Sequence, residues 1–221
     1  LGGPNVLHVD FRNPDGSRSF CGNGTRSALA WAQAQGAVDA MGHEVQIQAV
    51  DGGHKGRIRP NGCPGISMNV AATPVACAPQ LEGAHRAFFV DTGSPHHVEW
   101  LDAAKEVMAL QLPQAVRQIR HHERYAPEGC NVNVAARGVK KGHVHIRTFE
   151  RGVEAETLSC GTGVVAAALS DMREEKGLVM ERTVHAPGGV LEVHVRKNHH
   201  GSLEDVWLWG AAAKVMEGVW S

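Results

Sequence analysis

The motif Cys-Gly-Asn-Gly at residues 21–24 recurs as Cys-Gly-Thr-Gly at residues 160–163. Each copy is followed by an Ala-rich stretch, 25–35 in the first case and 164–176 in the second, and then by a glycine. Alanine and straight-chain residues favour helices, whereas glycine favours a helix end. Each motif therefore predicts a helix that begins at its cysteine.

The segments around the two motifs also match. An alternating apolar stretch precedes each motif, and a strand, a glycine turn and a second strand follow each predicted helix. The predicted strands cover residues 5–11, 45–50 and 57–59 in the first half and 143–149, 183–186 and 193–196 in the second. The chain is thus predicted to be an internal duplication with an offset of 139 positions. We expect residues 1–84, with 211–221 returning to them, to form one half and residues 85–210 the other.

Composition narrows the class of protein. The chain has 221 residues, of which 43% are hydrophobic and 20% charged, a balance that excludes extensive disorder. The net charge of −1 provides no basic field for nucleic acid or an anionic membrane surface. No apolar run approaches the ~20 residues of a membrane span. We therefore expect a cytoplasmic protein without a nucleic-acid or membrane partner.

The remaining cysteines and the histidines give no metal signature. Cys63, Cys77 and Cys130 form no closely spaced Cys pair of the kind that zinc sites use, and we expect them to have structural roles. Three pairs of adjacent histidines begin at residues 96, 121 and 199. Neighbouring residues on a strand point to opposite faces, so such pairs are poor chelates. We predict no metal site.

Cysteines at two helix starts suggest a specific chemistry. The positive end of a helix dipole favours a thiolate, and the backbone N–H groups there bind a carboxylate. If Cys21 and Cys160 faced each other across one ligand, one sulfur could remove a proton from a carbon beside a carboxylate. The other sulfur could return a proton to the opposite face. This two-base reaction inverts the carbon without a cofactor.

Four segments together resemble the diaminopimelate epimerase family. They are NPDGSRSFCGNGTR (13–26), TGSPHHV (92–98), PEGCNVNV (127–134) and ERGVEAETLSCGTG (150–163), and they occur in the family's order. The resemblance implies an α/β (α+β) fold of two pseudo-symmetric halves, each a barrel-like sheet wrapped around a central helix, with the active site in the cleft between them. It also implies a cofactor-independent homodimeric enzyme of lysine biosynthesis. Its small-molecule substrate would be diaminopimelate, interconverted between the LL and meso forms.

The resemblance also assigns roles to individual residues. Cys21 and Cys160 match the acid/base pair, and His96 and Glu150 match side chains that tune the thiols. Residues that match the contacts to the distal end of the substrate are Asn13, Asn131, Arg151 and Glu150. The reacting carboxylate would lie at the helix starts, on Gly22, Asn23, Gly161 and Thr162. Ser94 stands where the family often has asparagine, and it is included as a weaker substrate contact.

Two alternatives stay open at the sequence level. Proline racemases and hydroxyproline epimerases share the fold and the two thiols, but their cysteine motifs typically carry a His in the first copy and an Asp-Arg-Ser-Pro lead into the second. The other alternative is a truncated, inactive chain. About 70 residues lie between Ala87 and Cys160 but only 20 precede Cys21, so the duplication predicts a missing N-terminal segment of about 50 residues.

Overall fold

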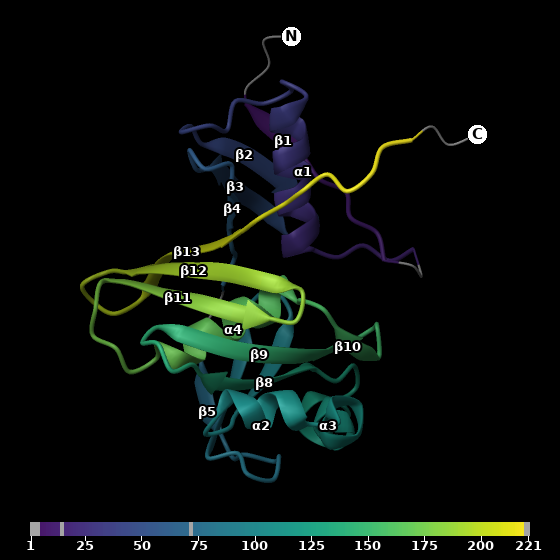
Figure 1. Cartoon of the computed structure of the whole chain (residues 1–221), viewed down its shortest axis with the longest axis vertical. Coiled ribbons are helices and arrows are strands. Elements are labelled where there is room, and N and C mark those ends of the chain that lie inside the picture. The colour runs from purple at the N-terminus through teal and green to yellow at the C-terminus, as the bar shows by residue number, and fades with distance from the viewer. Residues whose placement is uncertain (1–4, 14–15, 71–72, 219–221) are drawn as a thin grey trace. The chain divides into compact units, whose positions relative to one another are not determined.

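A computed structural model describes residues 5–13, 16–70 and 73–218. The chain divides into two compact units, Leu1–Ser67 with Trp209–Ser221 and Met68–Leu208 (Figure 1). The sequence-based boundary lies at residues 84 and 85, whereas the structure groups residues 68–84 with the second unit. A short strand, β5 (Val75–Cys77), accounts for the difference because it pairs antiparallel with β6 (Arg86–Asp91) of that unit.

The first unit packs one helix on a small sheet. Its sheet has the order β1 (Val6–His8), β2 (Val45–Ala49), β3 (Gly52–Ile58) and β4 (Pro64–Ser67). β1 runs parallel to β2, and the other neighbours are antiparallel. Helix α1 (Gly22–Ala34) packs against β3 and β4. A Cβ at Gly56 would lie 2.8 Å from side-chain atoms of Leu29 and Ile47, so glycine permits this close helix–sheet contact.

Helix α1 ends where the sequence predicts. Gly36 adopts a φ of 68°, its N–H donates to Gln33 O, and the next N–H, of Ala37, donates to Ala32 O. These two bonds form a Schellman motif, which satisfies carbonyl groups that the helix leaves unpaired. Glycine is favoured here because a side chain is strained in the left-handed region. The local sequence alone therefore determines this helix end.

The second unit is a larger mixed sheet with the order β13-β12-β11-β9-β8-β7-β6-β5, to which β10 adds at β9. The strands not yet given are β7 (Pro95–Trp100), β8 (Asn131–Arg137), β9 (His143–Glu150), β10 (Ala155–Thr157), β11 (Val179–Ala186), β12 (Gly189–Lys197) and β13 (Leu203–Gly210). The helices are α2 (Ala104–Ala109), α3 (Leu112–Arg120), the 3₁₀ helix η1 (Glu123–Tyr125) and α4 (Gly161–Asp171).

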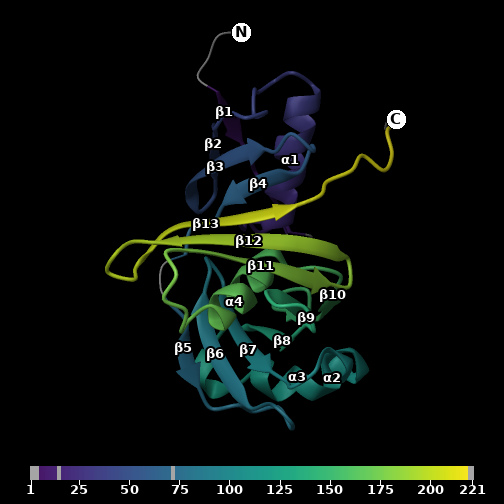
Figure 2. The same ribbon diagram turned by 60° about the vertical axis from the view of Figure 1, so that its left-hand side comes forward.

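Helix α4 is the centre of the second unit. Ten of its residues are buried, and it packs against β6, β7, β8, β9, β11 and β12 (Figure 2). A helix that is apolar on all sides is stable only when it is enclosed, and the curved sheet encloses it. On the other side of the sheet, α2 and α3 contact β8 and β9, where Val107, Leu112 and Val116 are fully buried. The barrel-like sheet around a central helix is thus present in this unit.

Both units repeat one topology. In the first unit, β1 precedes the helix and pairs in parallel with β2, which follows it; in the second, β9 and β11 have the same relation across α4. An antiparallel hairpin then follows in each case, β2 with β3 and β11 with β12. The mixed α+β fold and the duplication predicted from the sequence are therefore confirmed at the level of element order and strand pairing.

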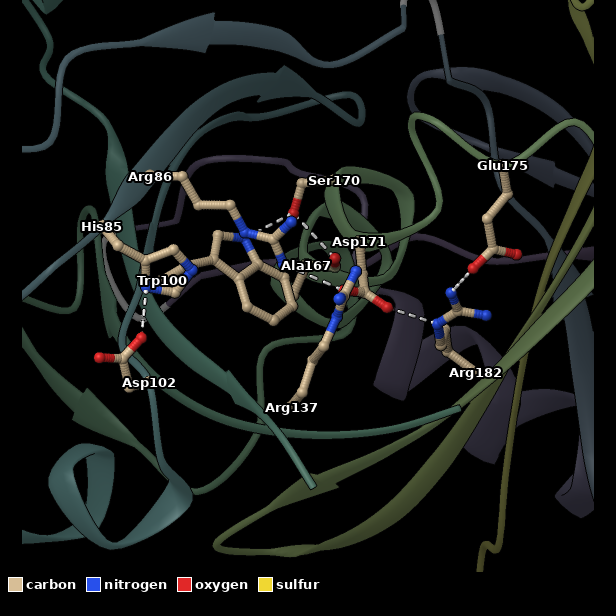
Figure 3. Close-up of polar contacts among 10 residues, drawn as sticks. All are labelled: His85, Arg86, Trp100, Asp102, Arg137, Ala167, Ser170, Asp171, Glu175 and Arg182. Atoms are coloured by element: carbon tan, nitrogen blue, oxygen red, sulfur yellow. Dashed lines mark hydrogen bonds and ion pairs between the residues drawn. The ribbon is translucent and has the colours of Figure 1, made fainter. Parts of the chain in front are cut away.

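The end of α4 differs from the sequence-based expectation. The prediction extended the helix to residue 176 before Gly177, whereas the helix ends at Asp171. The buried Asp171 carboxylate is bound by Arg137 and Arg182, each at 2.6 Å, and by Arg86 at 3.2 Å (Figure 3). Beside it, Trp100 Nε1 donates to Ser170 Oγ over 3.1 Å. Because these contacts come from distant strands, local helix propensity could not reveal them.

Candidate active site

Cys21 is the N-cap residue of α1, as predicted. Its backbone is extended, with a φ of −125°, and its Sγ accepts a hydrogen bond from Gly24 N over 3.3 Å. The sulfur therefore occupies the position at which a serine or aspartate oxygen usually caps a helix. A Cβ at Gly24 would lie 3.3 Å from this sulfur and 3.2 Å from the Phe11 ring. Glycine at position 24 thus leaves room for the capping thiol.

Cys160 is the N-cap residue of α4, the equivalent position, but its side chain makes no capping hydrogen bond. Its backbone is also extended, its side chain is buried, and its Sγ lies 3.3 Å from Thr162 Oγ1. Both predicted helix-start thiols are therefore confirmed in position. In the first motif a backbone N–H meets the sulfur, and in the second a side-chain hydroxyl does so.

His96 lies next to this second thiol. On β7, its Nε2 is 3.0 Å from Thr162 Oγ1 and its Nδ1 is 3.1 Å from Asn133 Nδ2. Complete burial, with a further contribution from the nearby Arg151 cation, lowers the pKa of His96 to about 3. The imidazole is therefore neutral at physiological pH. It reaches Cys160 through Thr162, within one cluster of the second unit.

A second group of predicted residues surrounds Asn131. The Asn131 amide donates to Ser94 Oγ over 2.8 Å and to Pro95 O over 3.1 Å, and its Oδ1 accepts from Arg151 N over 2.9 Å. Arg151 in turn pairs with Glu128 over 2.8 Å. Arg151 and Glu128 line a cavity of about 210 Å³ together with Phe89, Pro95, Arg124, Tyr125, Ala126, Pro127 and Gly129. A guanidinium beside a cavity suits recognition of a carboxylate.

Glu150 lies at the end of β9, next to Arg151. Its carboxylate accepts a hydrogen bond from the Thr157 hydroxyl of β10, the short strand that pairs with β9. The structure therefore places Glu150 at the start of the segment that leads to Cys160. Its predicted effect on a thiol stays a prediction.

The predicted residues of the first unit form local turns and caps. Asn13 donates to Ser17 Oγ over 3.0 Å and accepts from Ser19 Oγ over 3.3 Å, whereas Pro14 and Asp15 of the same turn lie outside the described residues. Asn23 Oδ1 accepts from Arg26 over 2.6 Å. Gly22 is the first residue of α1, as Gly161 is of α4. Their predicted substrate contacts stay predictions.

Sequence reasoning missed Asn133 and Thr148. Both side chains are buried, and the Thr148 hydroxyl donates to Asn133 Oδ1 over 3.0 Å. The signal for Asn133 was present in the Asn-Val-Asn pattern of β8, because residues two apart on a strand share a face. Thr148 has no comparable signal, since its partner is set by the register of β8 against β9.

The neighbouring histidines 96 and 97 point to opposite faces of β7, as predicted. His97 contacts Tyr125 OH at 2.6 Å and Glu99 Oε1 at 2.7 Å, so the two imidazoles share neither partner. Although burial opposes protonation, hydrogen bonds to Cys77 and Glu99 raise the pKa of His97 to about 9. Across residues 5–13, 16–70 and 73–218, no three His, Cys, Asp or Glu side chains are grouped so as to hold a metal ion.

The opposite pKa shifts of His96 and His97 predict opposite pH dependences of the free energy of unfolding. The His96 contribution is present above pH 6.5 and declines as the pH falls toward 3, because only the unfolded chain then gains a proton. The His97 contribution is present below pH 6.5 and declines as the pH rises toward 9. Urea unfolding from pH 5 to 9 measures the free energy of unfolding against pH. His96→Gln should change its pH dependence below pH 6.5, and His97→Gln should change it above pH 6.5. Each difference should reach at most about 1.4 kcal/mol per pH unit.

The exposed His43 provides the matched control, since its side chain is 68% accessible. His43→Gln should leave both sides of the profile nearly unchanged. A His97→Gln profile parallel to that of the wild type between pH 6.5 and 9 would contradict the assignment of a charged His97.

Within the part of the chain that the structure describes, no helix has both the length and the apolar surface needed to cross a membrane.

Comparison with known proteins tests the family resemblance. The family model described as diaminopimelate epimerase matches residues 88–213. The diaminopimelate epimerase of Aquifex aeolicus is 34% identical over 97% of this chain and 74% of its own length. The predicted resemblance is therefore confirmed by sequence over nearly the whole chain.

Solved structures agree on the fold. A phenazine biosynthesis protein of the PhzF family from Bacillus anthracis superposes with a TM-score of 0.67 at 16% identity, over 92% of this chain and 76% of its own. A probable proline racemase from Agrobacterium radiobacter gives a TM-score of 0.53 at 17% identity, over 89% and 66%. At such identities these two likenesses show a common fold alone. With the sequence match to the epimerases, they lead to one conclusion: this chain belongs to the diaminopimelate epimerase family.

Proposed function

We propose that this protein interconverts LL- and meso-diaminopimelate by proton transfer between two thiols and the α-carbon. The observation that carries the proposal is that both cysteines of the repeated motif occupy helix N-cap positions, in a chain of the diaminopimelate epimerase family. Each helix start offers N–H groups to a carboxylate and holds a sulfur beside them. Acid/base chemistry next to a bound carboxylate is what this arrangement can perform.

In the proposed step, the thiolate of one cysteine takes the proton from the α-carbon and becomes a thiol. The thiol of the other cysteine gives its proton to the opposite face and becomes a thiolate. The C–H bond that breaks is replaced by a C–H bond of opposite configuration, so no oxidant and no cofactor is consumed. The helix-start N–H groups at Gly22, Asn23, Gly161 and Thr162 would stabilise the negative charge that develops toward the carboxylate.

The polar group around Asn131 is proposed to bind the distal end of the substrate. Asn131, Arg151 and Ser94 already form a connected set beside a cavity, and a guanidinium can bind a carboxylate through two hydrogen bonds. We assign the second amino-acid end of diaminopimelate to these residues, with Asn13 and Glu150 contributing further polar contacts. A substrate that lacks this end, such as proline, would lose those interactions.

Solvent hydrogen exchange tests the reaction. In heavy water, with the protein kept reduced, LL-diaminopimelate should gain deuterium at one α-carbon as it is converted to the meso form. Mass spectrometry and chiral chromatography measure the two events together. Exchange into proline or hydroxyproline but not diaminopimelate would replace the proposal with the racemase alternative. Absence of exchange with all three would favour an inactive chain.

The proposal includes a compartment and an assembly state. The reaction needs thiols that are not oxidised, and reducing conditions are found in the cytoplasm. A homodimer is proposed on the basis of the family resemblance. Sedimentation equilibrium that finds monomers alone at micromolar concentrations would overturn this part.

A further inference from the structure

Asn133 has an amide orientation that its neighbours determine. One side of the amide faces His97 O and His96 Nδ1, each at 3.1 Å, and the other accepts the Thr148 hydroxyl over 3.0 Å. A carbonyl oxygen only accepts hydrogen bonds, so the group that faces His97 O must be the NH₂. The same NH₂ group therefore donates its other hydrogen bond to His96 Nδ1, which must act as an acceptor.

This orientation fixes the tautomer of His96. With Nδ1 as an acceptor in a neutral ring, the proton lies on Nε2. Nε2–H then donates to Thr162 Oγ1 over 3.0 Å. The hydroxyl has only one hydrogen, which remains available for the other neighbour of Thr162, the Cys160 sulfur at 3.3 Å. The direction of every hydrogen bond from Asn133 to Cys160 follows from this sequence of contacts.

We propose that Asn133 is a positioning residue for the epimerisation, acting through His96 and Thr162 so that the Thr162 hydroxyl donates a hydrogen bond to the Cys160 thiolate. The inference rests on the proposed function, since it concerns the sulfur that exchanges the proton. His96 is neutral and therefore does not supply a charge to the sulfur; it orients the hydroxyl. The chain of contacts from Asn133 to Cys160 is called the relay below.

The second glycine of the motif is required by the same contacts. A Cβ at Gly163 would lie 2.4 Å from Asn133 Oδ1, closer than nonbonded atoms approach. Gly24, its counterpart in the first motif, instead faces Phe11 and Cys21. The two copies of Cys-Gly-x-Gly thus keep glycine for different reasons, and only the second copy uses it to admit the relay.

The titratable groups around Cys160 set the conditions of a test. His96 of β7 faces Thr162, and Arg151, after β9, acts on His96 through its charge. Of these two groups, only Arg151 carries a charge near neutral pH. A change in the titration of Cys160 on removal of the neutral Thr162 hydroxyl therefore reports the hydrogen bond itself.

The test measures alkylation of Cys160 by iodoacetamide against pH, with peptide mapping by mass spectrometry. In Thr162→Val the pH midpoint for Cys160 should rise by about one unit and the rate at pH 7 should fall about tenfold, as expected for loss of a hydrogen bond to a charged group. Thr162→Ser retains the hydroxyl and should behave like the wild type. Cys21, read in the same digest, is the internal control and should not change.

A double-mutant cycle separates the relay from a structural role. Asn133→Ala should shift the Cys160 midpoint in the same direction as Thr162→Val, and the double variant should shift it no further, because both changes remove one hydrogen bond. Additive shifts, or a Thr162→Ser midpoint that moves as far as that of Thr162→Val, would overturn the relay. Circular dichroism establishes that each variant is folded.

Alkylation does not require diaminopimelate, so the two proposals can fail separately. A shifted midpoint in Thr162→Val, with no deuterium exchange by the wild type, would retain the relay and remove the proposed function. Exchange by the wild type with identical midpoints in all variants would retain the function and remove the relay. If both hold, kcat for Thr162→Val should fall about tenfold, with recovery in Thr162→Ser.

Discussion

Replacing either Cys21 or Cys160 with alanine is expected to lower kcat for the epimerisation by at least about 10³-fold. General acid or base catalysis by a positioned side chain contributes about 10²–10⁴-fold, and the two-base reaction uses one group on each face of the carbon. The Cys21 sulfur makes one capping hydrogen bond and the Cys160 sulfur makes none. Loss of a capping side chain costs about 0.5–2 kcal/mol, so the alanine variants should retain their fold. Conversion of LL- to meso-diaminopimelate under reducing conditions measures the effect.

Cys63 is the matched control for these variants. It is half-buried like Cys21 and lies in the same unit, outside the repeated motif. Cys63→Ala should retain kcat within about a factor of two, because a substitution away from the reacting groups changes little. If Cys21→Ala kept more than a tenth of the wild-type activity, the two-thiol mechanism would be wrong, whatever the substrate.

The largest expected effect on stability comes from Asp171. Its carboxylate, 4% exposed, is bound by Arg137, Arg182 and Arg86 at the end of α4 (Figure 3). Although burial opposes ionisation, hydrogen bonds from Arg182 and Arg137 hold the pKa of Asp171 below its usual value. Asp171→Asn has the same shape but removes the counter-charge that Arg137 and Arg86 contact, whereas Arg182 keeps its ion pair with Glu175. The free energy of unfolding should fall by about 3–5 kcal/mol.

Urea unfolding at pH 7 measures this loss, and pH provides an internal check. A carboxyl group with a depressed pKa stabilises the fold above its ordinary value of 3.8, and the contribution declines as the pH falls below it. The difference between wild type and Asp171→Asn should therefore shrink under acid conditions. A difference that stayed constant down to pH 3 would show that packing, rather than charge, is responsible.

An exposed ion pair serves as the control for Asp171. Asp205 pairs with Arg196 on the surface of the sheet, where the arginine side chain is 55% exposed. Exposed pairs contribute about 0–1 kcal/mol because water already solvates both charges. Asp205→Asn should thus cost no more than about 1 kcal/mol. Equal losses in the two variants would contradict the distinction between buried and exposed pairs.

Helices α1 and α4 show which helix ends can be predicted from local sequence. Both begin at the cysteine where the motif predicts, and α1 ends at its Gly36 cap through hydrogen bonds between residues close in sequence. The predicted end of α4 was wrong by five residues: the prediction continued to residue 176, whereas the helix ends at Asp171. Asp171 is held by arginines that lie 34 and 85 positions earlier in the chain, and such partners do not appear in a local pattern.

The same limit applies to the candidate site. Cys160, Thr162 and His96 were predicted and lie together in one cluster, and Ser94, Asn131 and Arg151 form a second group. Asn133 and Thr148 complete the first cluster and were not predicted. Their role depends on burial and on the pairing of β8 with β7 and β9. The role of a buried polar side chain depends on its hydrogen-bond partners, and here only the folded sheet brings those partners within hydrogen-bond distance.

The sequence by itself determined the duplication, the two capped helices, the family and the cysteines that carry the proposed chemistry, because each depends on residue identity and short-range spacing. The tertiary structure decided the protonation and direction of the contacts around Cys160. Those contacts depend on burial, which keeps His96 neutral, and on strand register, which places Asn133 against it. The reason for Gly163 lies there as well: the sequence shows a repeated glycine, and the fold shows that Asn133 occupies the space a side chain would need.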